Sequence, residues 1–207
     1  VRPALEQRFY RLTGREQDEW EELAPLDPAL VSATDACFVD RSLVVVGSRI
    51  EKDADGKVTV RRGVAAELAA GRWSVSELPS PVGAAVWSMT ALRCGRPRDR
   101  IYALAVTPAP NQPIGQRNLT GAPALYRFDG SKWQSLPLPA SDATAIGDTP
   151  RVTAFALDRG GAPWLSYAGD RERSASLHRY DGGAWTAVPL PRVPEVAFYS
   201  LTGLAFD

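Results

Sequence analysis

Residue types that usually carry catalysis or bind metals are scarce in this chain. His178 is the sole histidine, and Cys37 and Cys94 are the only cysteines. A Ser-His-Asp or Cys-His arrangement would therefore depend on His178. The usual zinc sites need several His or Cys ligands at set spacings, which these residues do not supply. We predict no catalytic residue, no metal site and no cofactor, so the protein is not expected to be an enzyme.

The acidic residues offer two further kinds of chemistry. Residues 53–56, Asp-Ala-Asp-Gly, begin like a calcium-binding loop. The third acidic position and the closing glutamate of such a loop are absent, so we interpret them as a solvated turn. A glycoside hydrolase or lyase would need two carboxylates at a defined separation. Asp142, Asp148 and Asp170 are candidates for that pair, and this enzyme is the least favoured alternative.

The charge balance and the apolar content of the sequence exclude some classes of binding partner. The chain has 24 Lys+Arg and 24 Asp+Glu, a formal net charge of zero. A neutral balance gives no electrostatic reason to expect nucleic acid or an anionic membrane as partner. No apolar run approaches the roughly 20 residues that span a bilayer. Lysine occurs only at positions 52, 57 and 132, a bias that suggests a bacterial source, with a location in the cytoplasm or outside it after removal of a signal segment.

The sequence contains a repeated unit, and the remaining candidate functional residues are interpreted from their places in it. Residues 125–133 read Leu-Tyr-Arg-Phe-Asp-Gly-Ser-Lys-Trp, and residues 177–185 read Leu-His-Arg-Tyr-Asp-Gly-Gly-Ala-Trp. Weaker copies lead to Trp20 and Trp73, so the tryptophans recur about every fifty to sixty residues. Each of these tryptophans begins a segment that ends in proline. Proline has no backbone N–H and cannot continue the hydrogen-bonded ladder of a β-sheet. Two runs of alternating apolar and polar residues, joined by a turn that contains Gly, predict a β-hairpin in each unit.

A second hairpin lies between these units. Its first strand is predicted at residues 35–40, 89–95, 152–158 and 201–207, and its partner strand at 43–47, 101–106 and 164–168. The third position of the first strand is small in every copy, as expected at a crowded centre: Ala36, Ala91, Ala154 and Gly203. Each unit is thus one antiparallel sheet of four strands, A to D in chain order.

Isolated four-stranded sheets would expose apolar faces and edges, so copies must pack face to face, and radial packing shelters the edges. The units resemble the bacterial two-component-regulator and kelch-like β-propeller repeats. This resemblance implies an all-β propeller fold and little about activity. We expect about three and a half to four blades in one domain or propeller fragment, with these units: 8–25 (partial), 34–79, 87–139, 151–191 and 200–207 (partial).

The final A strand stops at Asp207, where its partner strand should begin, and the chain starts at Val1. Three arrangements fit this pattern. The favoured one is a piece of a larger ring of six to eight blades, whose remainder lies on a second polypeptide or outside this sequence. The alternatives are a four-bladed ring with a missing strand and the association of two half-rings.

Most repeated residues have structural interpretations. His178 occupies the position of Tyr10 and Tyr126 and is expected to pack. The arginines that recur once per unit, at positions 11, 127 and 179, are expected to pair with a neighbouring blade. Asp-Gly pairs suit the positive φ angles of tight turns. The residues assigned to the repeat framework are Trp20, Trp73, Trp133, Trp185, Asp129, Gly130, Asp181 and Gly182.

Both cysteines fall at apolar positions of A strands. There a free cysteine behaves as a small hydrophobic residue, and this is our expectation. One disulfide between Cys37 and Cys94 is the alternative.

Loops at one end of the sheets are the predicted binding surface. The D–A and B–C connections of a propeller emerge on one face, and loops held by a rigid scaffold often bind partners. The irregular segment 107–123 is long for a compact domain, which indicates a function or disorder. The loop-face residues predicted to bind are Trp87, Asn111, Gln112, Gln116, Arg117, Asn118, Arg151, Arg171, Arg173 and Tyr199.

The leading hypothesis is a non-catalytic scaffold whose loop face binds a protein, as a regulatory or sensor module of a bacterial assembly. The partner would include the second chain that completes the propeller. The alternative is a lectin-like or cell-surface propeller that binds carbohydrate. That alternative expects one equivalent pocket per blade, each with an aromatic and polar residues.

Overall fold

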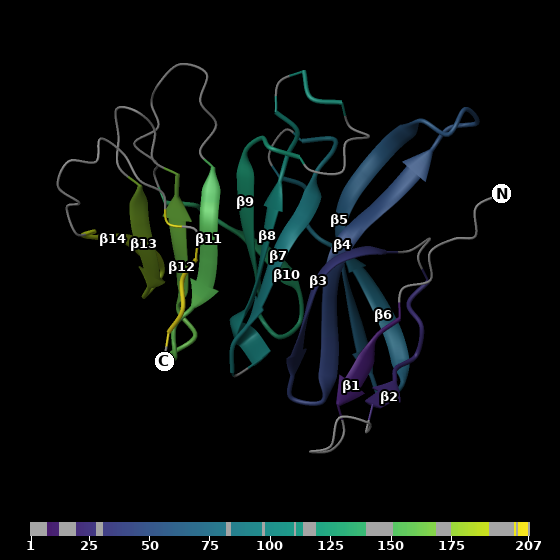
Figure 1. The fold of residues 1–207 in the computed structure, drawn as a ribbon, viewed down its shortest axis with the longest axis horizontal. Helices are drawn as coiled ribbons and strands as arrows, with labels where there is room; N and C mark the ends of the chain where they lie inside the picture. Colours follow the sequence, from purple (N-terminus) through teal and green to yellow (C-terminus); the bar gives the residue numbers. More distant parts are fainter. Residues whose placement is uncertain are drawn as a thin grey trace.

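The protein is built of β-strands in the computed structural model, which describes residues 8–12, 20–27, 31–81, 84–96, 98–109, 111–113, 119–139, 151–168, 175–190, 201 and 203–206. Within these residues, three antiparallel sheets have four strands each, and one has two. Figure 1 shows the three larger sheets side by side in chain order. Within the described residues no helix is long and apolar enough to cross a membrane.

Strand order within each sheet follows chain order, as the repeats predict. Sheet I contains β3 (Ser32–Val39), β4 (Ser42–Lys52), β5 (Val58–Ala69) and β6 (Arg72–Glu77). Sheet II contains β7 (Ser88–Cys94), β8 (Ile101–Val106), β9 (Pro123–Phe128) and β10 (Trp133–Leu136). Sheet III contains β11 (Val152–Leu157), β12 (Pro163–Tyr167), β13 (Ser176–Asp181) and β14 (Ala184–Val188). The two-stranded sheet pairs β1 (Tyr10–Leu12) with β2 (Trp20–Glu22), and a 3-10 turn covers Arg98–Arg100.

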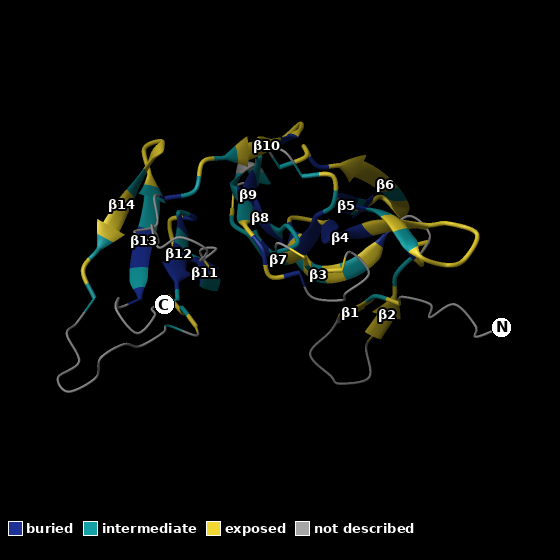
Figure 2. Cartoon of the chain, turned by 90° about the horizontal axis from the view of Figure 1, so that it is seen from above, coloured by how far each residue is buried: buried dark blue, intermediate teal, exposed yellow. Residues whose placement is uncertain are grey.

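Apolar side chains fill the spaces between successive sheets. Alternate residues of a strand point to opposite faces, so Val44 and Val46 of β4 face sheet II, whereas Leu43 and Val45 pack near the β1–β2 hairpin. A third cluster joins Leu104 and other residues of sheet II to sheet III. Sheets I and II are therefore covered on both faces, and Figure 2 shows buried residues in their central strands.

A β-bulge recurs in the A strands. Thr34, Thr90 and Thr153 are each the extra residue in the pairing of their strand with the next one. The Thr90 hydroxyl donates a hydrogen bond to Leu104 O (3.1 Å), and the Thr153 hydroxyl donates one to Ser166 O (3.3 Å). The repeated bulge gives every A strand the same local bend.

This bulge corrects the predicted alignment of the first repeat. Counted from the bulge, Asp35 is equivalent to Ala91 and Ala154, so assigning Ala36 to this small position was wrong. Asp35 Oδ2 accepts hydrogen bonds from Leu92 N (2.9 Å) and from Arg93 Nη1 (3.1 Å). An acidic residue at this position thus connects the A strands of sheets I and II.

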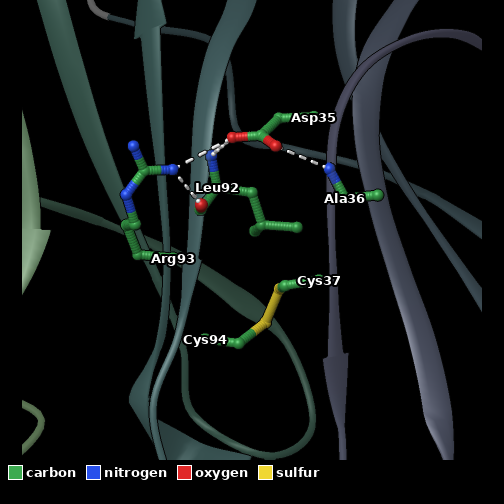
Figure 3. The surroundings of a disulfide bond; sticks show 6 residues. All are labelled: Asp35, Ala36, Cys37, Leu92, Arg93 and Cys94. Atoms are coloured by element: carbon green, nitrogen blue, oxygen red, sulfur yellow. Dashed lines mark hydrogen bonds and ion pairs between the residues drawn. A yellow bond between two sulfur atoms is a disulfide. The ribbon is translucent and has the colours of Figure 1, made fainter. Parts of the chain in front are cut away.

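A disulfide joins the same two strands, so the expectation of free cysteines was wrong. Cys37 of β3 and Cys94 of β7 are bonded across a Cα–Cα distance of 6.1 Å. Figure 3 shows the bond beside the Asp35–Arg93 ion pair. Arg93 Nε also donates to Phe155 O of sheet III (3.0 Å). A covalent and an ionic link therefore connect the A strands at the centre of the molecule.

Aromatic side chains connect each sheet to the end of the one before it. Trp73 Nε1 donates to Ala24 O (2.8 Å), Tyr126 OH to Pro79 O (2.8 Å), and Trp185 Nε1 to Pro137 O (2.7 Å). The acceptors lie in the segments that follow the last strand of each preceding unit. These tryptophans and tyrosines are thus contacts between repeats.

We expect the Trp185→Phe substitution to lower the free energy of unfolding by about 1 kcal/mol, because it removes one hydrogen bond to Pro137 O. Urea unfolding followed by circular dichroism measures the change. Trp20→Phe is the matched control, since Trp20 is 57% exposed. Equal losses in both variants would contradict a specific role for the indole hydrogen bond.

Trp20 and the C-terminal segment differ from their predicted structural roles. The exposure of Trp20 gives it little share in the core, unlike Trp133 at 8%. Residues 201 and 203–206 form no strand, although 201–207 was predicted as an A strand. Phe206 instead packs against Trp164, with ring centroids 5.0 Å apart.

The predicted Asp-Gly turns are confirmed. Gly130 and Gly182 have φ angles of 97° and 57°. Asp129 Oδ1 accepts hydrogen bonds from Lys132 N, Ser131 Oγ and Ser131 N at 2.8–2.9 Å. These donors lower the pKa of Asp129 to about 2, the Lys132 backbone contributing most.

We expect the Asp129 carboxylate to make stability depend on pH in acid. Its pKa is lowered on folding, so its stabilisation is present above the ordinary value of 3.8 and is lost as pH falls toward about 2. Between pH 4 and pH 2, the melting temperature of the wild type should fall further than that of Asp129→Asn, whose amide does not titrate. Parallel declines would contradict this assignment.

The arginines of the repeat pair within their own sheets, so the expected pairing with a neighbouring blade was wrong for those whose partners are identified. Arg179 donates to Asp158 (3.0 Å) and to Asp181 (2.7 Å), and Arg11 pairs with Glu21 on the adjacent strand. His178 is 9% exposed and packs edge-on against the Tyr167 ring, in agreement with its predicted packing role.

Candidate binding site

A polar cavity of about 460 Å³ lies between sheets I and II. It is found where β3 and β7 begin and β8 ends, at the end opposite the turns that contain Asp40 and Ala70. This is the end from which the β4–β5 hairpin projects and the 107–122 connection leaves (upper part of Figure 1). The described residues that line it are Ser32, Ala33, Thr34, Ser48, Arg61, Ser88, Met89, Thr90, Val106 and Leu119.

Arg61 is the cationic residue of this lining. It lies on β5, whose residues alternate between the two faces of sheet I. Arg61 shares a face with Gly63 and Ala65 and is 8% exposed, whereas Arg62 points away and is exposed. Strand geometry therefore directs the Arg61 guanidinium toward sheet II.

The segment before β7 holds this part of β5 in place. Trp87 N donates to Arg61 O (2.9 Å), and Arg61 and Val86 form a parallel β-bridge. Gly63 is necessary here, because a Cβ at this position would lie 2.0 Å from the Trp87 ring. The Arg61 backbone is thus fixed by contacts from both sheets.

Hydroxyl groups line half of the cavity, on Ser32, Thr34, Ser48, Ser88 and Thr90. Ser48 Oγ of β4 and Ser88 Oγ of β7 are hydrogen-bonded to each other at 2.8 Å, across the junction of the two sheets. Thr34 and Thr90 are the bulged residues of their strands, so the repeated bulge brings both to this cavity. Hydroxyls can rotate to donate or accept, which suits them to bind a polar ligand.

Arg61 brings a positively charged side chain to the cavity. Burial lowers the pKa of Arg61 from its ordinary value of 12.5. Arginine nevertheless stays protonated in proteins at neutral pH. The described lining residues include one cation and no carboxylate. A guanidinium flanked by hydroxyls can bind and orient an acidic group.

A second cavity, of about 320 Å³, lies between sheets II and III and has a different character. It is also lined by bulged threonines, Thr90 and Thr153, together with Arg93 and Phe155. Arg93, however, forms an ion pair with Asp35. The second lining also includes an aromatic side chain, Phe155, which the described lining of the first cavity does not, so the two cavities are not equivalent.

The structure changes the interpretation of several residues predicted to bind. Trp87 is 2% exposed and stacks on Tyr126 at 5.8 Å, so the expectation of an exposed loop-face tryptophan was wrong. It belongs to the core because its segment docks onto β5. Arg151 is exposed next to β11, and Asn111 is exposed with a φ of 64°.

The Gln112 side chain links the two ends of the 107–122 connection by hydrogen bonds. Its Oε1 accepts hydrogen bonds from Ala109 N and Thr120 N, both at 3.0 Å. Gly121 N and Thr107 N add backbone hydrogen bonds across the same segment. The described part of this connection is therefore stabilised by hydrogen bonds within the segment itself. Other predicted site residues lie outside the described part of the chain: Gln116, Arg117, Asn118, Asp142, Asp148, Asp170, Arg171, Arg173 and Tyr199.

Residues 53–56 form the solvated turn that was predicted. Asp53 Oδ1 accepts hydrogen bonds from Asp55 N (3.1 Å) and Lys57 N (2.9 Å), within an exposed segment. Among the described residues, no group of three or more His, Cys, Asp or Glu side chains could hold a metal ion.

Sequence reasoning missed Arg61, Ser48 and Ser88. A usable signal was present: period-two alternation places Arg61 on the same face as the small residues Gly63 and Ala65. No protein-family model matches this sequence, and no curated protein or solved structure does either. The site must therefore be interpreted from its own geometry.

Proposed function

We propose that this chain is a β-propeller module whose loop end binds a protein partner. The term loop end denotes the side of the sheets that carries the 460 Å³ cavity, the β4–β5 hairpin and the 107–122 connection. Support for the propeller comes from three four-stranded sheets with the same strand order, stacked face to face. Strand β7 contacts β3 on one side and β11 on the other, as the inner strands of a propeller do.

The observation that carries the binding function is the buried Arg61 in a hydroxyl-lined cavity at the loop end. Cavities of roughly 300–1,000 Å³ with a few converging polar groups are typical binding sites. The scaffold beneath is cross-linked by a disulfide and an ion pair, so these groups are held in fixed positions. Recognition is thus proposed to be the role of this end.

The disulfide supports a further part of the proposal, that the protein acts in an oxidising compartment. Disulfides persist in the periplasm and outside the cell, whereas cytosolic thiols are kept reduced. An exported regulatory or sensor module is the form of the leading hypothesis that fits the Cys37–Cys94 bond.

The carbohydrate alternative finds less support. It expects equivalent aromatic-containing pockets, but the cavities on the two sides of sheet II differ, since only the one beside sheet III has an aromatic residue, Phe155, in its described lining. The described lining of the Arg61 cavity contains no aromatic residue.

Hydrogen exchange on the native complex tests the proposed function. The protein is purified from its own source, its partner is identified by native mass spectrometry, and amide exchange is compared with and without that partner. We expect slower exchange at the start of β7 and in residues 107–113, and no change at the turns around Asp40 and Asp129. Protection confined to those turns, or a monomer without any partner, would overturn the proposal.

A further inference from the structure

We propose that a smaller cavity between sheets I and II, at the end of the sheets opposite the loop end, binds one neutral pyranose sugar unit. The volume of this cavity is about 170 Å³, and we call it the Trp133 cavity. The proposal uses six of the described residues that line it: Glu67, Ser74, Ser76, Arg98, Phe128 and Trp133. This inference goes beyond the proposed function, because it concerns a different ligand at the other end of the molecule.

Strand pairing brings these groups together. Glu67 of β5 and Ser74 of β6 form a directly opposed pair, so both side chains lie on one face of sheet I. Ala65 shares this face and belongs to the core cluster between sheets I and II. Phe128 and Trp133 are an opposed pair of β9 and β10 that packs in the same cluster. The cavity therefore lies between the two sheets, beside the turns that follow β5 and β9 (lower part of Figure 1).

The charges of the Trp133 cavity favour a neutral ligand. Arg98 Nη2 forms an ion pair with Glu67 Oε2, and the guanidinium lies over the Phe128 ring, 5.7 Å from its centroid. This pair balances the two charges of the described lining. It also places a carboxylate acceptor beside guanidinium donors, and hydrogen bonds to charged groups are the stronger ones. A ligand with hydroxyl groups, which both donate and accept, matches such a pair.

Two donors at the cavity have no partner within the fold. Arg98 Nε is buried and makes no hydrogen bond. The indole N–H of Trp133 has no acceptor among the described residues, whereas those of Trp73 and Trp185 donate to backbone carbonyls of the preceding units. Buried polar groups are normally hydrogen-bonded, so exceptions call for a partner such as a bound molecule. A ligand rich in oxygen acceptors supplies partners of this kind.

The size and the aromatic wall of the cavity indicate a single ring. A cavity of roughly 150 Å³ accepts a benzene molecule, so the volume here suits a ligand with one six-membered ring. The Phe128 and Trp133 ring centroids are 5.4 Å apart, and Trp133 is 8% exposed. These rings can pack against the C–H groups of a sugar while its hydroxyls bind the ion pair. A pyranose presents both kinds of surface.

The junction of sheets II and III lacks this combination. Arg127, opposed to Gln134, holds in sheet II the place that Glu67, opposed to Ser74, holds in sheet I. The indole N–H of Trp185 is already bonded to a backbone carbonyl. We therefore expect one such site in the described part of the chain, in contrast to the repeated pockets of the lectin-like alternative.

Nuclear magnetic resonance titration of the full chain, labelled with nitrogen-15, tests the inference. The probes are the methyl α-pyranosides of glucose, mannose and galactose. We expect at least one of them to bind saturably and to shift the amide signals of Glu67 and Ser74 and the indole N–H signal of Trp133. The amide signals of Ser48 and Ser88, at the loop end, should stay in place. Cyclohexanol, a six-membered ring with one hydroxyl, should bind roughly tenfold more weakly, because it leaves hydrogen bonds to the ion pair unmade.

Variants assign the binding to the Trp133 cavity. Glu67→Gln keeps the shape of the side chain but removes its charge, and it should weaken sugar binding by roughly tenfold. Glu77→Gln is the matched control, since this exposed carboxylate of β6 lies at the loop end, and it should bind like the wild type. Trp133→Phe removes the indole N–H, should also weaken binding, and provides the readout if Glu67→Gln does not fold. The dispersion of each amide spectrum reports folding.

Three results would overturn the inference. The absence of saturable shifts with all three glycosides would show that water alone satisfies the donors. Equal loss of affinity in Glu67→Gln and Glu77→Gln would place the sugar elsewhere. Tighter binding of methyl glucuronide than of the methyl glucoside would show that the cavity selects an anion. Each of these results leaves the proposed function standing if the native partner still protects the loop end.

Discussion

Removing the disulfide is expected to lower the free energy of unfolding by about 4 kcal/mol. Cys37 and Cys94 are 57 residues apart in the sequence, and a cross-link that closes a loop of this length restricts the unfolded chain by roughly that amount. The bond also joins the A strands of sheets I and II, so its loss removes a direct link between them. The Cys37→Ser, Cys94→Ser double variant and the wild type are compared by urea unfolding.

The reduced wild type is the control for this substitution. It keeps both sulfur atoms in place, whereas serine introduces two hydroxyls at half-buried positions. Both samples should unfold at a lower urea concentration than the oxidised wild type, and the slopes should show whether the unfolded state has expanded. An identical midpoint for the oxidised and reduced wild type would show that the bond contributes nothing to stability.

Strand order was predictable from the sequence because it depends on local patterns. Residues 101–106 were predicted as a strand, and β8 is Ile101–Val106. The partner strand of β3 was predicted at residues 43–47, but β4 continues to Lys52. Its extension pairs with β5, including Arg49 with Arg62, and the register shifts between Glu51 and Lys52. Polar residues on both strands hid this hairpin, because even its buried face carries polar side chains, Ser48 and Arg61.

To predict the Cys37–Cys94 disulfide, the A strands of the repeats must be aligned in the correct register. The alignment of the small residues did not give that register. Counted from the bulge at Thr34, Cys37 lies one position away from its place in the alignment of the small residues, and a one-residue shift moves a side chain to the other face. The threonine column at Thr34, Thr90 and Thr153 was visible in the sequence and would have given the observed register. Aligning the small residues instead led to the wrong assignment of Ala36.

The candidate site was predictable only in its location. The loop end follows from the strand order, but the residues that line its cavity come from strands of two sheets. Alternation along β5 places Arg61 on the same face as Gly63 and Ala65, but no local pattern reveals that sheet II covers this face. The aromatic residue chosen from its position in a loop, Trp87, is instead part of the core.

The Trp87→Ala substitution should therefore cost about 3–5 kcal/mol of stability, which is the usual loss when a buried tryptophan is truncated. Trp87 is 2% exposed, stacks on Tyr126 and lies against Gly63. Its backbone also donates to Arg61 O, so collapse around the cavity left by the side chain would disturb the candidate site. Urea unfolding followed by circular dichroism measures the loss.

Trp20→Ala is the matched control, because it removes the same side chain at a position that is 57% exposed. Its effect should stay within about 0.5 kcal/mol, as for most exposed substitutions. The sequence had suggested the reverse, with Trp20 in the repeat framework and Trp87 at a binding surface. Equal losses in the two variants, or a larger loss for Trp20→Ala, would show that the face-to-face packing of sheets I and II does not place Trp87 in the core.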